Sequence, residues 1–427
     1  MARILFVTQT HNVWGGMEQW LHHFSLWLQR EGWEVFAALP RGARFNDPEA
    51  YLREHPHLRL VTLDVRAGTE RTRVTRLAQA IRDVRPDIVL PIASGAVFDA
   101  VAMARTKGAS PRLIVPVRSM HPDLFCNIAG RFEIVDQVVA ISRLIEAVLR
   151  ELLPAASDRL HYVRHGARPP HRSHFEGGGP LRAGFVGRIE ESTKRVSDLA
   201  SLADALDDDV ELHVFGSGPD EALLRHPRIT MHGALSQQEL YERAYPMLDA
   251  LLLFSPAEGS PNAVYEAMQH GVVPVVARYA GQVSEAIVRD GETGMTFPVG
   301  DVAAAAAALR LLAGDRARHT ALSVAAVAEV REDTDERMHR DWQRILERAL
   351  ALPPKGGAAV RLPRAGRIDF LPPAIGDAIR RLRRPRAVDG WDEWPGTAPA
   401  AGECVERVRA LIARLDAEGV TYTPKGK

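Results

Sequence analysis

The stretch "DALLLFSPAEGSPNAVYEAMQHGVVPVVA" (residues 249–277) predicts a strand, a loop, a helix and a second strand, in that order. "DALLLF" is a short apolar run typical of a buried strand, and "VVPVVA" is rich in β-branched valine. Between them, Asn262 to His270 predicts a helix, with Gly259 to Asn262 at its entrance. Two strands joined by a helix lie parallel in one sheet, so this stretch predicts an α/β fold.

The same alternation of β-branched runs and amphipathic segments extends along most of the chain. Residues 16–32 predict a helix, because Trp20, Phe24 and Leu28 recur at intervals of four and Gly32 follows as a stop signal. The other predicted strands are "RILFVT", "WEVFAAL", "LRLVTL", "PDIVLPI", "RLIVPV", "QVVAIS", "LRAGFVG", "VELHVFG" and "RITMHG". This pattern predicts parallel sheets covered by helices on both faces.

The alternation stops at "GARPPHRSHFEGGGP" (residues 166–180), whose prolines and glycines predict an interdomain linker. We therefore expect one Rossmann-like domain over residues 1–170 and a second over residues 171–350. Helices from about Asp301 to Leu350 are expected to close the second domain. In tandem, two such sheets face each other across a central cleft at the carboxyl ends of their strands, where ligands bind.

The bulk composition excludes several functional classes. The 427 residues are 46% hydrophobic, and 54 basic residues balance 54 acidic ones, which argues against a nucleic-acid partner. Cys126 and Cys404 form neither a disulfide framework nor a metal spacing, so we expect free thiols in a reducing compartment. The start "MARILFVTQT" predicts a strand instead of a signal peptide, and no apolar run is long enough for a membrane span. These features predict a soluble, cytoplasmic protein.

Two glutamates in the opening stretch have the types and positions that sugar recognition requires. Glu258 follows the strand "DALLLF" and can accept hydrogen bonds from sugar hydroxyls, while Glu266 on the helix can accept a pair from a ribose diol. Free backbone N–H groups at the start of the helix can donate hydrogen bonds to phosphate or sugar oxygens. The stretch that offers them comprises Gly259, Ser260, Pro261, Asn262 and Ala263. The spacing alone also fits two solvated glutamates on a helix.

Three further loops follow predicted strands. In "FVGRIEESTKRVSDL", Arg188 and Lys194 could hold a diphosphate and offset the charge of a leaving phosphate. In "TQTHNVWGGMEQW", Gly15 and Gly16 let the backbone approach a ligand at the start of a helix. In "HVFGSGPDEALL", the full dinucleotide fingerprint is missing. We therefore interpret Gly216 as part of a turn that lines the cleft. Ordinary turns and a solvated basic loop are the alternative interpretations.

Taken in order, these motifs resemble the GT-B retaining glycosyltransferases of family 4, also called glycosyl transferases group 1. The resemblance covers residues 1 to about 350. The stretches that carry it are "GGMEQWLHHFSLWLQREGWEV", "VGRIEESTKRVSDL", "HVFGSGPDEALL", "HGALSQQELYERAYPMLDALLLFSPAEG", "EGSPNAVYEAMQHGVVPVVA" and "AGQVSEAIVRDGETGMTF".

The resemblance implies a role for each candidate residue. Arg188 and Lys194 would bind the donor diphosphate, Glu266 would hold the ribose, and Glu258 would contact the transferred sugar. A histidine after a first-domain strand would lie near the reacting sugar, and His121 in "LIVPVRSMHPDLF" fits that position. Two residues depart from the pattern: Arg195 replaces the commoner glycine after Lys194, and His165 precedes Gly166 where the family usually has asparagine.

The function that the resemblance implies is retaining, metal-independent transfer of a hexose from a UDP- or GDP-sugar to an acceptor hydroxyl, in bacterial glycan or glycoconjugate biosynthesis. No cofactor is expected beyond the nucleotide-sugar. The acceptor stays open between a glycan, a lipid-linked glycan and a small molecule. A dinucleotide-dependent oxidoreductase and a non-catalytic GT-B partner subunit are the alternatives.

Two acidic pairs have the D-x-D spacing that could suggest a metal site. Asp207 and Asp209 precede a strand, and Asp333 and Asp335 open a late helix. Because neither pair lies at a cleft end, we expect both to be solvated turns or helix caps, and we expect no metal.

The extension over residues 351–427 is rich in Pro, Gly and Arg and predicts two helices, at 373–384 and 401–419. The first would place apolar residues on one face and four arginines on the rest, as in helices that lie on anionic lipid. The alternative that we favour is a helix whose apolar face docks on the protein. Peripheral contact with the inner face of the membrane therefore stays open.

Overall fold

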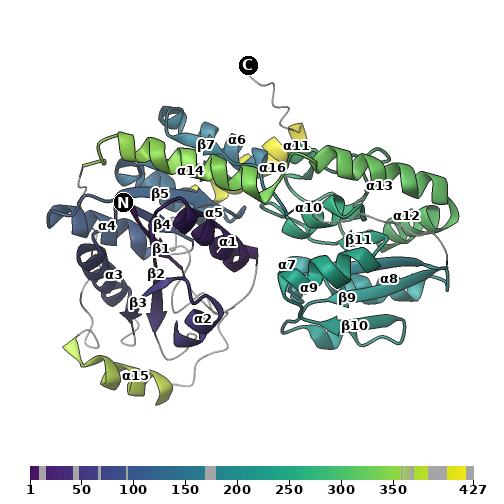
Figure 1. Cartoon of the computed structure of the whole chain (residues 1–427), viewed down its shortest axis with the longest axis horizontal. Helices are drawn as coiled ribbons and strands as arrows, with labels where there is room; N and C mark the ends of the chain where they lie inside the picture. Colours follow the sequence, from purple (N-terminus) through teal and green to yellow (C-terminus); the bar gives the residue numbers. More distant parts are fainter. Residues whose placement is uncertain are drawn as a thin grey trace.

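The structure is a computed structural model, and it describes residues 1–8, 16–41, 48–65, 69–92, 95–168, 179–356, 359–360, 362, 365, 370–382 and 402–419. Two parallel sheets, each with helices on its faces, lie side by side (Figure 1). The predicted α/β class with two Rossmann-like domains is confirmed.

The first sheet has seven strands in the order β3-β2-β1-β4-β5-β6-β7, and every pairing in it is parallel. The strands are β1 (Arg3–Val7), β2 (Glu34–Arg41), β3 (Arg59–Asp64), β4 (Ile88–Pro91), β5 (Arg112–Val117), β6 (Gln137–Ala140) and β7 (Leu160–Tyr162). The first six match predicted runs. The sequence did not indicate β7, which has only three residues.

The second sheet has six strands in the order β10-β9-β8-β11-β12-β13, again all parallel. The strands are β8 (Leu181–Val186), β9 (Val210–Phe215), β10 (Ile229–Gly233), β11 (Ala250–Leu253), β12 (Val273–Ala277) and β13 (Met295–Phe297). The opening stretch is confirmed as the β11–α10–β12 unit, in which Ala250 pairs with Val273.

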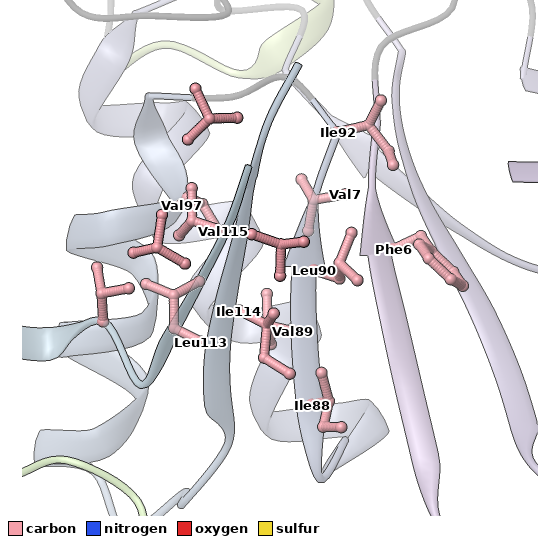
Figure 2. Close-up of a cluster of buried hydrophobic side chains, with 14 of the residues drawn as sticks. Phe6, Val7, Ile88, Val89, Leu90, Ile92, Val97, Leu113, Ile114 and Val115 are labelled. Atoms are coloured by element: carbon pink, nitrogen blue, oxygen red, sulfur yellow. The ribbon is translucent and has the colours of Figure 1, made fainter. Parts of the chain in front are cut away.

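Burial on both faces explains why the central strands are apolar without alternation. In Figure 2, side chains of β1, β4 and β5 pack together with Val97 of α4. Phe6, Ile88 and Leu90 are fully buried. A parallel sheet with helices on both faces requires such continuous apolar strands.

Helices occupy the connections between strands. In the first domain these are α1 (Gly16–Arg30), α2 (Pro48–Glu54), α3 (Glu70–Val84), α4 (Ala96–Thr106), α5 (Pro122–Gly130) and α6 (Arg143–Leu152). In the second they are α7 (Glu191–Lys194), α8 (Ser197–Ala205), α9 (Gln237–Glu239), α10 (Asn262–Gln269), α11 (Gln282–Glu285), α12 (Val302–Gly314) and α13 (Arg316–Val330). Single turns of 3-10 or π helix are η1 (Phe132–Ile134), η2 (Pro154–Ala156), η3 (Glu221–Leu224), η4 (Leu240–Ala244) and η5 (Tyr245–Met247).

Helix α14 (Asp335–Ala351) returns from the second domain to the first, as the light-green ribbon in Figure 1 shows. Its buried side chains, Met338, Trp342 and Leu346 among them, belong to the first-domain core, and the Trp342 ring lies 5.1 Å from the ring of Trp20. The prediction that all helices up to Leu350 close the second domain is therefore wrong for α14. Its helical periodicity indicated an apolar face but not which sheet that face would cover.

The two passages of the chain between the domains touch each other. Ala167 donates its N–H to Asp333 O at 2.9 Å, and Asp335 N donates to Ala167 O at 3.2 Å. A Cβ at Gly166 would lie 2.0 Å from Thr334 O, so only glycine allows this approach. This explains the glycine of the His165–Gly166 pair in structural terms.

The extension contains α15 (Pro373–Leu382) and α16 (Gly402–Glu418), close to the two predicted helices. Ile375 of α15 is 49% exposed and Phe370 just before it is 79% exposed. The prediction that the apolar face of this helix docks on the protein is therefore wrong at Ile375. Helix α16 instead buries Val408, Leu411 and Leu415 against the first domain.

Cys126 of α5 and Cys404 of α16 form a disulfide, with their Cα atoms 6.0 Å apart. The prediction of two free thiols is therefore wrong. A sequence separation of 278 carried no spacing signal for the pair. The cross-link fixes α16 to the first domain.

No helix in the described part of the chain is long and apolar enough to cross a membrane.

Candidate functional site

The carboxyl ends of the two sheets approach each other through three predicted donor-binding residues. Asn262, at the start of α10, donates its Nδ2 to the carbonyl oxygen of Gly16, at the start of α1, at 3.4 Å. A Cβ at Gly259 would lie 2.2 Å from the carbonyl oxygen of Arg118, which follows β5. Gly259 is therefore required where the second domain meets the first. Gly15 lies outside the described residues.

Lys194 and Glu258 form an ion pair, with Nζ 2.5 Å from Oε1. Their side chains are 23% and 13% exposed, so the pair is partly shielded from water. Lys194 ends the short helix α7 and Glu258 follows β11, so the fold brings together residues 64 positions apart. An arriving phosphate could take over the ammonium group, and a sugar hydroxyl could take over the carboxylate.

The residue after Lys194 has a backbone conformation that favours glycine. Arg195 has a φ of +48°, in the left-handed region that glycine occupies at little cost. Its guanidinium group pairs with Asp198 at 2.8 Å. That contact directs the side chain to the first turn of α8.

Arg188 follows β8 and forms an ion pair with Glu190, at 2.5 Å. Its side chain is 45% exposed. Its charge also acts on Glu18 of the first domain. Arg188 therefore pairs with a carboxylate of its own loop and also influences a carboxylate of the first domain.

Two further residues at the contact between the domains, Glu18 and Arg118, are not among the site residues that the sequence predicts. Glu18 is only 6% exposed, and burial raises its pKa from 4.5 to about 7, although the charges of Arg118 and Arg188 oppose the rise. Burial also lowers the pKa of Arg118 to about 10, and its guanidinium carbon lies 4.4 Å from the ring centroid of Trp20. A glutamate in the first helical turn is common near a helix dipole, so Glu18 carried no signal of its own.

Glu266 is 4% exposed and lies on the inner side of α10. Tyr245 donates its hydroxyl to Oε2 at 2.5 Å, and Gln237 donates its Nε2 to Oε1 at 3.2 Å. Burial raises the pKa of Glu266, and these two hydrogen bonds oppose the rise. Beside it is a cavity of about 30 Å³, and Lys194 is not among the described residues that line it.

Gly216 and the glycine two positions later have a structural explanation. Gly216 has a φ of +156°, and a Cβ there would lie 1.8 Å from the carbonyl oxygen of Gly187. A Cβ at Gly218 would lie 2.1 Å from the carbonyl oxygen of Ile189. The two glycines therefore allow the loops after β8 and β9 to touch.

The rest of the loop before α10 is compact. Pro261 precedes the first residue of the helix, and Val264 N donates to its carbonyl oxygen at 3.0 Å. Within the described ranges, the buried hydroxyl of Ser260 has no hydrogen-bond partner. Ala263 is half-buried in the first helical turn.

His121 lies on the loop after β5, three positions beyond Arg118. It precedes α5, its side chain is 61% exposed, and its Nδ1 lies 3.3 Å from Asp123 Oδ2. This position places the imidazole near the surface of the first domain.

The two D-x-D pairs differ. Asp207 and Asp209 are both exposed, as expected of a solvated turn, and Asp207 lies near Arg310. Asp333 is buried and lies 2.9 Å from Arg164 Nε, so the prediction of a solvated turn is wrong there. Among the described residues, no group of three or more His, Cys, Asp or Glu side chains is arranged to hold a metal ion.

Part of the second domain is similar to a known sequence family. Residues 180–315 match the family described as Glycosyl transferases group 1. The match includes Arg188, Lys194, Glu258 and Glu266. No curated protein matches the chain.

Several solved structures have the same two-domain fold. The apo form of the lipopolysaccharide outer core galactosyltransferase WaaB is 19% identical, with a TM-score of 0.60 over 81% of this chain and 99% of that chain. Sucrose-phosphate synthase from Thermosynechococcus elongatus is 16% identical, with a TM-score of 0.69 over 82% and 100%. Anabaena Alr3699/HepE in complex with UDP-glucose is 16% identical, with a TM-score of 0.64 over 82% and 100%. The fold is therefore GT-B.

Proposed function

We propose that this protein is a glycosyltransferase that moves a hexose from a nucleotide-diphosphate-sugar to an acceptor hydroxyl. The observation that carries the proposal is the position of the Glycosyl transferases group 1 match. It contains Lys194 and Glu258, which form an ion pair at the carboxyl end of the second sheet. The structure of Anabaena Alr3699/HepE with UDP-glucose supports a UDP-sugar as the first donor to test, with a GDP-sugar as the second.

In the proposed reaction, Lys194 and Arg188 offset the negative charge that grows on the diphosphate as the bond from the anomeric carbon to the phosphate oxygen breaks. Charge stabilisation by preorganised donors is the largest single contribution in many enzymes. Glu258 accepts hydrogen bonds from hydroxyls of the transferred sugar, and the backbone N–H groups from Gly259 to Ala263 contact sugar or phosphate oxygens. Glu266 accepts hydrogen bonds from the ribose, and the loop at Gly15 and Gly16 approaches the phosphate.

We propose further that transfer retains the anomeric configuration and requires no metal. The acceptor oxygen would bond to the anomeric carbon on the face that the phosphate leaves, and the acceptor proton would pass to the leaving phosphate oxygen. The cations Arg188 and Lys194 would take the part that a divalent ion takes elsewhere. His121, whose side chain is exposed on the loop after β5, would lie near the reacting sugar.

A panel of UDP- and GDP-sugars tests the proposal directly. Incubation with each donor and a set of glycan, lipid-linked and small-molecule acceptors should yield nucleoside diphosphate and one glycosylated product, with undiminished yield in EDTA. The ¹H coupling constant at the new anomeric centre should match that of the donor. Failure of every nucleotide to bind, together with saturable binding of NADH, would support the oxidoreductase alternative.

We propose a cytoplasmic location, with residues 370–382 as a point of peripheral contact with the inner membrane face. The exposed side chains of Phe370 and Ile375 support such contact. Sedimentation with anionic vesicles should fall after truncation at Leu352, and unchanged sedimentation would contradict the proposal.

A further inference from the structure

Gln237 joins the two domains through a single side chain. Its Oε1 accepts a hydrogen bond from Nε2 of His23, on α1 of the first domain. Its Nε2 donates at 3.2 Å to Oε1 of Glu266, on α10 of the second domain. Because an amide oxygen only accepts, His23 must carry its proton on Nε2 in this arrangement.

The backbone holds Gln237 firmly in this place. Ser236 caps α9, and its hydroxyl accepts from Glu239 N, while the Glu239 carboxylate accepts from Ser236 N. This reciprocal arrangement fixes the first turn of the helix, and Gln237 is its first residue. The neighbouring Gln238 faces elsewhere and bonds Glu242 at 2.8 Å.

The space beside Glu266 is too small for a nucleoside while Gln237 stays there. The cavity of about 30 Å³ lies between His23 and Trp20 of the first domain and Gln237 and Glu266 of the second. Such a volume admits water, but a ribose needs several times more. Displacement of Gln237 would enlarge this space on the side of Glu266.

We propose that Gln237 is a latch that occupies the place of a ribose hydroxyl on Glu266. This inference rests on the proposed function, in which Glu266 holds the donor ribose. An amide N–H and a ribose O–H are both donors, and both can satisfy the same buried carboxylate oxygen. Tyr245 already satisfies the other oxygen, at 2.5 Å.

Exchange of one donor for the other links donor binding to the contact between domains. When the ribose hydroxyl replaces Gln237 on Glu266, the amide swings away and its contact with His23 breaks. A buried Glu266 carboxylate without a donor would cost free energy. Gln237 therefore leaves Glu266 only when a ribose hydroxyl takes its place. The latched population lowers the apparent affinity for nucleotides, because only the unlatched fraction binds.

The test is calorimetric titration of UDP, GDP and inorganic pyrophosphate into the wild type, Gln237→Ala and the control Gln238→Ala. Gln237→Ala should bind UDP and GDP about fivefold more tightly, because the hydrogen bond from Gln237 no longer competes with the ribose for Glu266. A change of this size is typical of one hydrogen bond. Pyrophosphate lacks ribose, so its affinity should stay unchanged, as should every affinity in Gln238→Ala. Unchanged or weaker nucleotide binding in Gln237→Ala would overturn the latch.

A nucleotide-free arm separates failure of the latch from failure of the proposed function. His23→Ala and Gln237→Ala should both broaden the interdomain distance distribution in small-angle X-ray scattering, and Gln238→Ala should not. If the wild type binds neither nucleotide, the proposed function fails. If the scattering of His23→Ala and Gln237→Ala equals that of the wild type, the latch fails even where nucleotides bind.

Discussion

The carboxylates on the two sides of the interdomain contact differ in where their partners come from. On the connection side, which we define by Glu285 and Asp416, the hydrogen bonds cross between parts of the chain. Glu285 accepts from Arg143 N at 2.8 Å and from the Tyr162 hydroxyl, both in the first domain, and Asp416 of α16 accepts from Gly281 N at 2.7 Å. These contacts hold the domains together.

On the donor side, defined by Glu258 and Glu266, the partners belong mainly to the second domain itself. Glu258 is paired with Lys194, and Glu266 is bonded to Tyr245 and Gln237. These carboxylates can exchange a partner for a ligand while the rest of their own domain stays fixed. The comparison therefore predicts that donor-side changes affect activity and connection-side changes affect stability.

The largest expected effect is on activity, from Lys194→Ala. Loss of one preorganised cation next to the developing phosphate charge should lower turnover by about 10²–10³-fold. The measurement is the steady-state rate with the nucleotide-sugar that the wild type uses best. Arg195→Ala is the matched control, because that side chain pairs with Asp198 and should change the rate by less than about threefold.

The thermal transition of Lys194→Ala should stay close to that of the wild type, since a partly exposed ion pair contributes little to stability. Wild-type turnover in this variant would refute the assignment of Lys194.

Glu285→Ala should have the largest effect on stability. The substitution leaves Arg143 N and the Tyr162 hydroxyl without their acceptor, and we expect a loss of about 3 kcal/mol in unfolding free energy. Urea denaturation followed by tryptophan fluorescence measures it. Glu292→Ala, in an exposed pair with Arg289, is the control.

Glu258→Ala sharpens the comparison. Its loss of stability should stay below about 1 kcal/mol, because its partner Lys194 can turn to water. Equal losses in Glu258→Ala and Glu285→Ala would remove the distinction between the two sides.

An effect of similar size is expected from pH, through Glu18 of the first domain. Its folded pKa of about 7 lies above the ordinary 4.5, so the folded state binds more protons between these values. Stability therefore falls as pH rises from about 4.5 to 7, by on the order of 3 kcal/mol. Glu18→Gln should lose this part of the slope in unfolding free energies measured at pH 5, 6, 7 and 8. A slope as steep as that of the wild type would show that burial of Glu18 does not contribute.

Most of the fold was predictable because it depends on local patterns. Continuous apolar runs mark strands buried on both faces, as in β4, β5, β6, β11 and β12. The three-residue strands β7 and β13 are too short to give such a pattern. Helix α14 has a clear apolar face, but only the tertiary arrangement decides that Trp342 packs beside Trp20.

For the candidate site, the sequence indicated residues that directly follow predicted strands. Lys194 and Glu258 were both singled out and do pair. Glu18, Arg118 and Gln237 were not, because their importance arises from residues of the other domain. Single residues that meet only through the fold leave no spacing in the sequence.

The smallest expected effect concerns α16, which strengthens the connection side from outside. The Cys126–Cys404 disulfide ties α16 to α5, and Arg414 pairs with Glu151 of the first domain. If the cross-link is removed by Cys404→Ser, α16 can detach before either domain unfolds. The thermal midpoint should then move by only about 2 °C, while trypsin cleavage within residues 402–419 accelerates about tenfold.

Alkylation provides the control for this last variant. In the unreduced wild type, Cys126 and Cys404 should both resist iodoacetamide under denaturing conditions, and after reduction both should react, as intact mass shows. Asp416→Asn keeps the disulfide and weakens only the contact with Gly281 N, so it should leave the cleavage rate within about twofold. Equal cleavage in Cys404→Ser and the wild type would mean that apolar packing of Val408, Leu411 and Leu415 is enough to hold α16, and the connection side would then depend on Glu285 without a covalent support.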